Sequence, residues 1–316
     1  MPGTTPPTIA VFTKNRINPA YAAARLGAAR VAARYGARTV DYIPERPDNV
    51  EEQIALLEQA IRDRPDAIVL VPVHETAVDA AVRGVREAGI PVVNCVNRLG
   101  SPEDYACFVG SDDRALADEI AERLFAALGG RGDVVIIEGT PGAATARDRQ
   151  RGFLDAAARY PDIRIVASRT GNYLQADARE AMTALLAAHA TVDGVLAAND
   201  SMALGAIEAL RAAGRTSVVV GANAIPEAIT AIKDGSMLAS ADFDAYKMAC
   251  VAAEATVRLL RGLPVPKEIM LPVEIVDATN YGPWELPIAE RTRPPWDAVV
   301  TDDAYRVPIE DAVEPR

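Results

Sequence analysis

Short runs of β-branched residues alternate along the chain with alanine-rich segments of helical period. This alternation is typical of an α/β fold with parallel sheets, and strands without polar interruptions indicate burial on both faces. The first series predicts strands over residues 8–13, 39–43, 67–71 and 91–96, and helices over residues 19–35, 49–62 and 76–88.

The pattern pauses at the glycines of residues 129–132 and then starts again. The second series predicts strands over 134–137, 164–168, 192–197 and 218–221, and helices over 146–159, 175–188, 202–213 and 226–233. Two similar series predict two similar lobes, each a doubly wound parallel sheet with flanking helices. The length of 316 residues agrees, because a single hydrophobic core usually serves about 100–200 residues.

Polar residues follow the predicted strands, where open parallel sheets bind their ligands. Asn18, Asn97, Asn199 and Asn223 each present a donor and an acceptor, which matches the character of a hydroxyl group. Each of these asparagines taken alone is equally well explained as a turn residue or a helix cap. Together, at the ends of several strands, they favour a small hydroxylated ligand.

Arginine and tyrosine side chains at neighbouring positions extend this prediction. The guanidinium groups of Arg98 and Arg149 can donate two parallel hydrogen bonds to vicinal hydroxyls or to a carboxylate. Tyr21 and Tyr173 can stack on the apolar face of a sugar ring, a contact worth about 1 kcal/mol.

Composition and charge exclude several classes of function. A net charge of −11 leaves no basic face for nucleic acid, and no apolar run approaches the roughly 18–20 residues of a membrane span. The chain has two histidines and lacks the common nucleophile, phosphate-loop and dinucleotide motifs. We therefore expect no enzymatic activity, no cofactor and no metal.

Neither the cysteines nor the N-terminus identify a cellular compartment by themselves. Cys95, Cys107 and Cys250 lack metal-site spacing and are interpreted as buried thiols, although a Cys95–Cys107 disulfide stays open. Residues 1–7 have neither the basic nor the apolar region of a signal peptide, which leaves a processed leader and a different start site as alternatives.

Four passages carry a resemblance to a known family. Asn-Asp-Ser-Met-Ala-Leu-Gly at 199–205 is the most specific, and it is joined by Asn-Pro-Ala-Tyr at 18–21, Ile-Pro-Val with Asn-Arg at 90–98, and Arg-x-Arg-x-x-Gly-Phe at 147–153. Over residues 8–276 the chain resembles the ribose-type periplasmic sugar-binding proteins, whose fold is shared with the effector-binding core of lac-repressor-like regulators.

The resemblance implies a type I periplasmic binding protein whose lobes are joined by a three-segment hinge. The crossovers would lie near residues 111–113, 242–244 and 272–274. The lobes would then comprise residues 1–111 with 244–272, and residues 112–243 with 273–282. The remaining residues, 283–316, include both tryptophans and form either a strap over one lobe or a partly disordered extension.

The resemblance also implies a ligand pocket. Its residues would be Lys14, Asn18, Tyr21, Asn97, Arg98, Arg149, Tyr173, Asn199, Asn223 and Asp244. Asn97 and Asn223 stand where the family commonly has Asp, and Lys14 stands where a small hydroxyl residue is usual.

These departures leave three cations against the single carboxylate of Asp244, an arrangement that is costly to bury without further anions. One hypothesis is a negatively charged ligand such as a sugar acid. The other is a neutral sugar or polyol, with Lys14 pointing away or paired with a lobe carboxylate such as Asp112.

The sequence thus predicts a monomeric solute-binding protein of an ABC-type importer. It would capture a small carbohydrate, namely a monosaccharide, a polyol or a sugar acid, between two closing lobes in the periplasm and pass it to a membrane permease. The alternative is a cytoplasmic carbohydrate-effector sensor, similar to a regulator without a DNA-binding headpiece, since residues 1–7 leave no room for one.

Overall fold

The computed structural model describes residues 5–309, which divide into two compact units. The first unit contains the chain up to Gly110, Ala245–Leu271 and the residues from Ile288 on. The second contains Ser111–Asp244 and Pro272–Pro287. The predicted α/β fold with two similar lobes is confirmed. The chain passes between the units a fourth time, after Pro287, which the sequence did not indicate.

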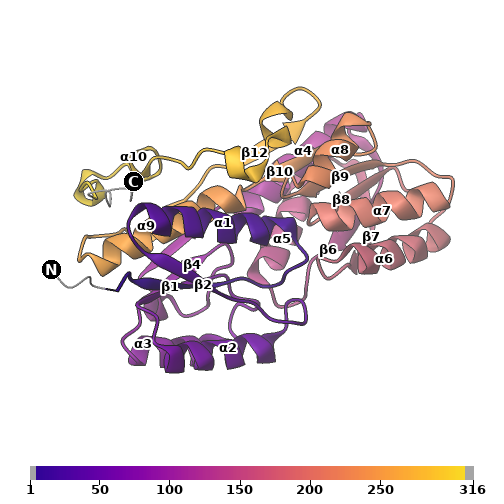
Figure 1. The fold of residues 1–316 in the computed structure, drawn as a ribbon. Helices are drawn as coiled ribbons and strands as arrows, with labels where there is room; N and C mark the ends of the chain where they lie inside the picture. The colour runs from indigo at the N-terminus through magenta and orange to yellow at the C-terminus, as the bar shows by residue number, and fades with distance from the viewer. Residues whose placement is uncertain (1–4, 310–316) are drawn as a thin grey trace. The chain divides into compact units, whose positions relative to one another are not determined.

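The first unit has a six-stranded sheet in which every pair of neighbouring strands is parallel. Its order is β11-β5-β4-β3-β1-β2. Helices α1 and α9 pack together on one face, and α2 and α3 cover the other (Figure 1). The bounds are β1 (Thr8–Phe12), α1 (Pro19–Arg34), β2 (Arg38–Tyr42), α2 (Val50–Asp63), β3 (Ala67–Leu70), α3 (Asp79–Glu87), β4 (Val92–Cys95), β5 (Cys107–Gly110), α9 (Ala245–Leu260) and β11 (Glu268–Met270).

The second unit repeats this arrangement with the order β12-β10-β9-β8-β6-β7. Helix α4 packs against α5, and α6 packs against α7. Its last strand, β12, differs in running antiparallel to β10. The bounds are α4 (Asp113–Ala127), β6 (Arg131–Glu138), α5 (Ala144–Ala157), β7 (Asp162–Thr170), α6 (Gln175–Ala188), β8 (Gly194–Ala197), α7 (Asp200–Ala212), β9 (Val218–Ala222), α8 (Pro226–Lys233), β10 (Ala239–Asp242) and β12 (Glu274–Asp277).

The strand order fixes where each sheet can bind a ligand. In the first unit β1 lies between β2 and β3, and in the second β6 lies between β7 and β8. The chain therefore continues from the central strand to its neighbour on one side and then crosses to the strand on the other side, which makes this position the switch point of the sheet. In such sheets ligands bind beyond the carboxyl ends of the strands at the switch point. The residues that follow β1, β3, β6 and β8 are therefore placed to meet a ligand.

Each principal helix pair has one glycine at its closest approach. A Cβ atom on Gly27 of α1 would lie 2.6 Å from the carbonyl oxygen of Tyr246 in α9. A Cβ atom on Gly152 of α5 or on Gly205 of α7 would likewise lie 2.2 Å from a backbone carbonyl oxygen of α4 or of α6. The alanine-rich composition thus reflects helices that pack closely enough to exclude larger side chains.

The pause in the sequence pattern at residues 129–132 is not a boundary between the units. Gly129 and Gly130 have φ angles of 67° and 75°, and they turn the chain from α4 into β6 within the second unit. Glycine adopts this left-handed conformation without strain. The passage between the units comes earlier, after Gly110.

The three cysteines are free and buried, which confirms their interpretation as buried thiols. Cys95 and Cys107 lie on the neighbouring strands β4 and β5. Burial in this apolar layer raises the pKa of each thiol to about 12. Within residues 5–309, no helix has both the length and the apolar character needed to cross a membrane.

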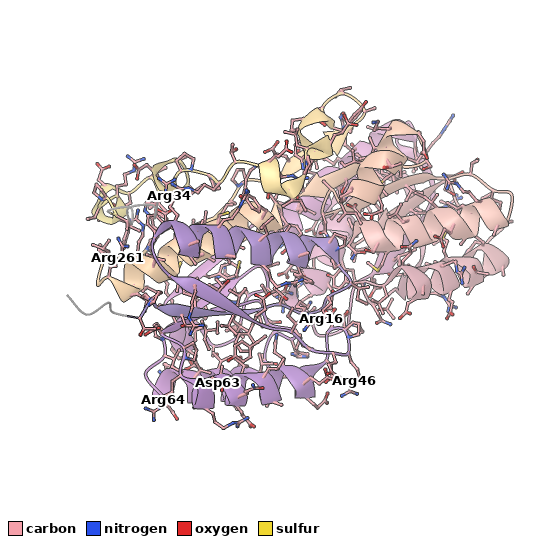
Figure 2. The ribbon with its side chains drawn as sticks, in the orientation of Figure 1. Arg16, Arg34, Arg46, Asp63, Arg64 and Arg261 are labelled. Atoms are coloured by element: carbon pink, nitrogen blue, oxygen red, sulfur yellow. The ribbon has the colours of Figure 1, made fainter. Side chains whose placement is uncertain are left out.

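The C-terminal segment packs on both units in turn. Residues Gly282–Glu285 form a short 3-10 helix, η2, on the second unit. Further on, the indole of buried Trp296 lies 4.0 Å from the guanidinium of Arg258 in α9, and Arg293 pairs with Glu254 of the same helix at 2.8 Å. Just after α9, Arg261 donates to the carbonyl of Tyr35, and the guanidinium groups of Arg261 and Arg34 lie 5.7 Å and 5.9 Å from the Tyr35 ring (Figure 2).

Candidate functional site

The predicted site residues of the first unit follow β1 and β4 at the carboxyl edge of its sheet. Lys14 lies two residues after β1, and Asn18 begins α1, in which Tyr21 is buried. Asn97 and Arg98 follow β4. Lys14 and Asn18 therefore lie beside the switch point, as the sequence predicts for a ligand-binding position.

Lys14 is almost fully buried, with 1% of its surface exposed, and it has a carboxylate partner. Its ammonium lies 3.9 Å from Asp48 Oδ2, and the backbone N–H of Asp48 donates to the carbonyl of Lys14. Asn15 Nδ2 donates to the other carboxylate oxygen at 2.9 Å. The carboxylate suggested from the sequence, Asp112, instead caps α4 by accepting two backbone N–H groups.

Asn18 has the structural role that the sequence left open. Its Oδ1 accepts the backbone N–H of Ala20 at 3.0 Å and caps α1. Asn15 Oδ1 accepts the N–H groups of Ile17 and Asn18, which fixes the loop between β1 and α1. These hydrogen bonds connect the loop to the start of α1.

Two buried amides that the sequence analysis did not identify hold the neighbouring loops. Asn94 donates to the carbonyls of Leu70 and Asn97 and accepts the N–H of Leu99. Gln53 spans the loop after β3 in the same way, between Val71 and Val73. The signal was present, because Asn94 is a polar residue within an otherwise apolar buried strand.

The structure directs Arg98 away from the switch point. Its guanidinium lies 4.0 Å from the ring centroid of Phe108 and pairs with Glu268 of β11. Strand β11 forms the edge of the sheet on the side away from β1 and β2. About half of each charged side chain is exposed, at 44% and 46%, so this is a surface ion pair.

Arg149 is the centre of the predicted set in the second unit. Its side chain is only 4% exposed and donates to Asp113 Oδ1 at 2.7 Å and to the carbonyl of Ala198 at 2.6 Å. The Phe243 ring lies 5.3 Å from its guanidinium. Burial raises the pKa of Asp113, and the neighbouring Arg149 opposes that rise. One arginine thus connects the start of α4 with the ends of β8 and β10.

Asn199 and Tyr173 are brought together beside this arginine. Asn199 caps α7 through the N–H of Met202 and donates to the carbonyl of Tyr173 at 3.3 Å. The Tyr173 hydroxyl lies 3.1 Å from Thr145 Oγ1. A Cβ at Gly139 would approach the tyrosine ring to 2.1 Å, so the glycine after β6 leaves space for the ring.

Asn223 and Asp244 lie at the ends of the next two strands. Both have positive φ angles, 116° and 50°, which are rare outside glycine. Asn223 Oδ1 is buried without a hydrogen-bond partner in the structure. The backbone N–H of Asp244 donates to Asp242 Oδ1 at 2.7 Å, so Asp242 is a buried carboxylate at this edge that the predicted set omitted.

Asp200, the first residue of α7, connects β10 to the loop after β9. It is buried, and it accepts the Ser240 hydroxyl at 2.6 Å and the N–H of Ile225 at 2.9 Å. A Cβ on Gly221 would approach its carboxylate to 2.4 Å. Burial raises the pKa of Asp200 to about 6, against the lowering effect of these hydrogen bonds.

The structure changes the charge balance inferred from the sequence. Each of the three predicted cations has its own carboxylate, in the pairs Lys14–Asp48, Arg98–Glu268 and Arg149–Asp113. These carboxylates were not part of the predicted set. These three cations therefore do not supply the uncompensated positive charge from which a charged ligand was inferred. Over residues 5–309, no three His, Cys, Asp or Glu side chains gather in a metal-binding arrangement.

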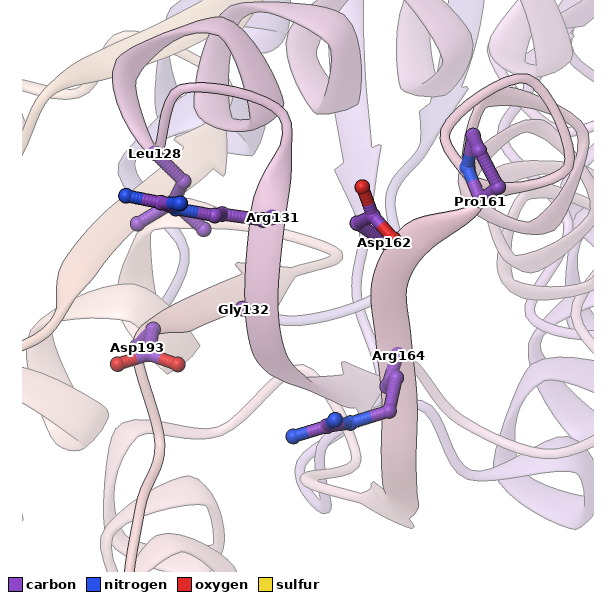
Figure 3. Close-up of a pocket in the computed structure, with 7 residues that line it drawn as sticks. All are labelled: Leu128, Arg131, Gly132, Pro161, Asp162, Arg164 and Asp193. Atoms are coloured by element: carbon purple, nitrogen blue, oxygen red, sulfur yellow. The ribbon is translucent and has the colours of Figure 1, made fainter.

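A pocket of about 680 Å³ lies elsewhere on the second unit. Figure 3 shows Arg131 and Arg164 on the neighbouring strands β6 and β7, with Asp162 and Asp193 nearby. These residues lie at the amino ends of the strands, opposite to the edge that carries Arg149 and Asn199. The pocket is thus separate from the candidate site.

Residues 9–264 match the family model described as a periplasmic binding protein domain. The D-ribose/D-allose-binding protein of Pseudomonas aeruginosa is 36% identical over 241 residues, which are 73% of this chain and 75% of that protein. An ABC transporter periplasmic solute-binding protein from Actinobacillus succinogenes, solved with bound D-allose, has a TM-score of 0.82 and 31% identity over 86% of this chain and 98% of its own. A solute-binding protein from Bacillus halodurans with bound myo-inositol has a TM-score of 0.82 and 26% identity over 90% and 99%.

Proposed function

The chain belongs to the periplasmic binding protein family, and we propose that it captures a neutral monosaccharide or polyol for an ABC-type importer. The observation that carries the choice of a neutral ligand is the pairing of every predicted cation with a carboxylate of its own unit. A sugar acid would have to compete with these internal carboxylates, whereas hydroxyl groups can add hydrogen bonds without displacing an ion pair.

The similar proteins support the same class. The names of those compared above refer to D-ribose, D-allose and myo-inositol, none of which carries a charge. In each unit, the residues proposed to contact ligand lie at the carboxyl edge of its sheet. The first unit contributes Lys14, Asn18, Tyr21 and Asn97, and the second contributes Arg149, Tyr173, Asn199, Asn223 and Asp244.

The proposed role is binding without chemistry. The family consists of binding proteins, and the residues at the two sheet edges form hydrogen-bond networks instead of a nucleophile with an adjacent base. The protein would act as a monomer outside the cytoplasm and deliver its ligand to a membrane permease. A nucleic-acid partner is not part of the proposal, since the net charge is −11.

Thermal unfolding against matched ligands tests this function. D-ribose, D-allose, xylitol and myo-inositol form the neutral set, and D-ribonate and D-xylonate form the acidic set. A ligand at 100 times its Kd stabilises the folded state by about 2.7 kcal/mol, which is a measurable rise in Tm. We expect that rise with at least one neutral compound and with neither acid. Stabilisation by the acids alone would contradict the proposal.

A further inference from the structure

Trp284 lies in a segment that follows the region matched to the family model, which ends at residue 264. Its indole is buried, and Nε1 donates to Asp242 Oδ2 at 2.6 Å. Asp242 ends β10, at the edge of the sheet that carries the candidate site. The C-terminal segment therefore contacts this edge directly.

The carboxylate of Asp242 connects that indole to the predicted ligand residue. Its other oxygen, Oδ1, accepts the backbone N–H of Asp244 at 2.7 Å. Asp244 has a φ of 50°, a conformation that a residue with a side chain keeps only where its surroundings hold it. Phe243, between them, lies against Arg149. The same turn thus carries Asp244 and the aromatic neighbour of Arg149.

Several contacts within the second unit hold the indole in place. Strand β12 pairs with β10 in antiparallel register, with Glu274 opposite Asp242, and the chain then returns toward the end of β10. The 3-10 helix η2, which contains Trp284, packs against α8. There Glu285 pairs with Lys233, whose ammonium lies 5.5 Å from the ring of Tyr281. The segment that carries the indole donor is thus anchored to α8 within the second unit.

We propose that Trp284 is a positioning residue of the ligand site, acting through Asp242 on the turn of Phe243 and Asp244. A hydrogen bond from an N–H group to a carboxylate is stronger than one between neutral groups, and it holds the carboxylate in a single orientation. The inference rests on the proposed function for its ligand, whereas the effect on the turn is independent of any ligand.

The chain provides a matched control, because Trp284 and Trp296 are its only tryptophans. Trp296 is also buried, but its Nε1 donates at 2.8 Å to the carbonyl of Tyr305 in the first unit. Trp284→Phe and Trp296→Phe each remove one indole donor and keep an aromatic ring. The two variants differ in whether the lost donor reaches Asp242.

Backbone amide exchange measured by NMR on the full chain without ligand tests the effect on the turn. We expect the Asp244 amide to exchange at least about tenfold faster in Trp284→Phe and at the native rate in Trp296→Phe. In the same spectra the two indole N–H signals are assigned from the two variants. An Asp244 amide that exchanges at the native rate in Trp284→Phe would overturn the proposal.

Calorimetric titration with D-ribose, D-allose and myo-inositol, each used as a separate probe, tests the effect on binding. We expect Trp284→Phe to weaken the Kd about tenfold and Trp296→Phe to leave it within about twofold. In the Asp242→Asn background, Trp284→Phe should add almost nothing, because its route to the turn is already broken. Additive effects would overturn the role of Asp242. If no probe binds the native protein, the proposed ligands are wrong, and amide exchange still decides whether Trp284 holds the turn.

Discussion

The two units have the same strand order but hold their ligand edges with different chemistry. In the first unit, the neutral amides Asn94 and Gln53 hold the loops after β4 and β3, the pair of Lys14 and Asp48 is buried, and the Arg98 ion pair is half-exposed. In the second unit, buried charged side chains connect the strand ends, through Arg149 with Asp113 and through Asp200. The topology therefore determines where the strand ends lie, while the side chains that fix them are free to differ.

This difference has an energetic consequence. A buried charge that loses its partner is left in a medium of low polarity, whereas an exposed charge is solvated by water. We therefore expect substitutions of buried charges, such as Asp113 and Asp200, to cost more than substitutions of a buried amide or of the half-exposed Arg98–Glu268 pair.

The largest effect is expected for the buried pair of the second unit. Asp113→Asn leaves the guanidinium of Arg149 without its carboxylate, and breaking such a pair typically costs about 3–5 kcal/mol. Urea unfolding measures this loss, with the transition of the second unit scored by itself if the two units unfold separately. A loss below about 1 kcal/mol would show that Arg149 does not depend on this carboxylate.

The pH dependence of Asp200 is expected to be next in size. Its folded-state pKa of about 6 is above the ordinary value of 3.8, so the folded protein binds more protons between these values. The free energy of unfolding therefore falls as pH rises from about 4 to about 6, by up to about 3 kcal/mol, and this contribution stays lost above pH 6. Unfolding of Asp200→Asn at the same pH values should lack this part of the slope. Parallel pH profiles for the two proteins would contradict the prediction.

The amide network of the first unit gives a smaller effect. Asn94→Ala removes three hydrogen bonds and leaves the carbonyls of Leu70 and Asn97 and the N–H of Leu99 without this partner. We expect a loss of about 2 kcal/mol in the free energy of unfolding, measured in urea. A change within about 0.5 kcal/mol would mean that water replaces the amide.

The smallest effect is expected for the surface pair of the first unit. Glu268→Gln removes the charge next to Arg98 and keeps a hydrogen-bond acceptor. Exposed pairs contribute about 0.2–1 kcal/mol, and salt screens them further. Unfolding at low and high salt checks this value. A cost similar to that of Asp113→Asn would remove the distinction between buried and half-exposed ion pairs.

Elements with a strong local signal could be predicted from the sequence. Helices α6 and α8 have the predicted bounds, Gln175–Ala188 and Pro226–Lys233, because periodicity and flanking residues mark both ends. Helices α4 and α9 were nevertheless not predicted. Strands β5, β10, β11 and β12 have only three or four residues and were not predicted either. Such short strands depend on neighbours far away in the sequence, since β11 pairs with β5.

The same limit applies to the site. The polar residues after β1, β4 and β8 could be placed at strand ends from the pattern alone, and their contact with ligand stays a prediction. Their partners could not be found in this way, because Arg149 and Asp113 are 36 residues apart and Arg98 and Glu268 are 170 apart. The charge of the site therefore depends on tertiary contacts that local sequence does not reveal.

The most direct test of a neutral ligand uses the pair of Lys14 and Asp48. Calorimetric titration of the native protein and of Asp48→Asn with D-ribose and D-ribonate compares a neutral sugar with the corresponding acid. Asp48→Asn keeps an acceptor for Asn15 but removes the charge that balances the buried ammonium. We predict that the native protein binds D-ribose more tightly than D-ribonate, and that the variant shifts this preference toward the acid by about tenfold or more. Tighter binding of D-ribonate by the native protein would contradict the account.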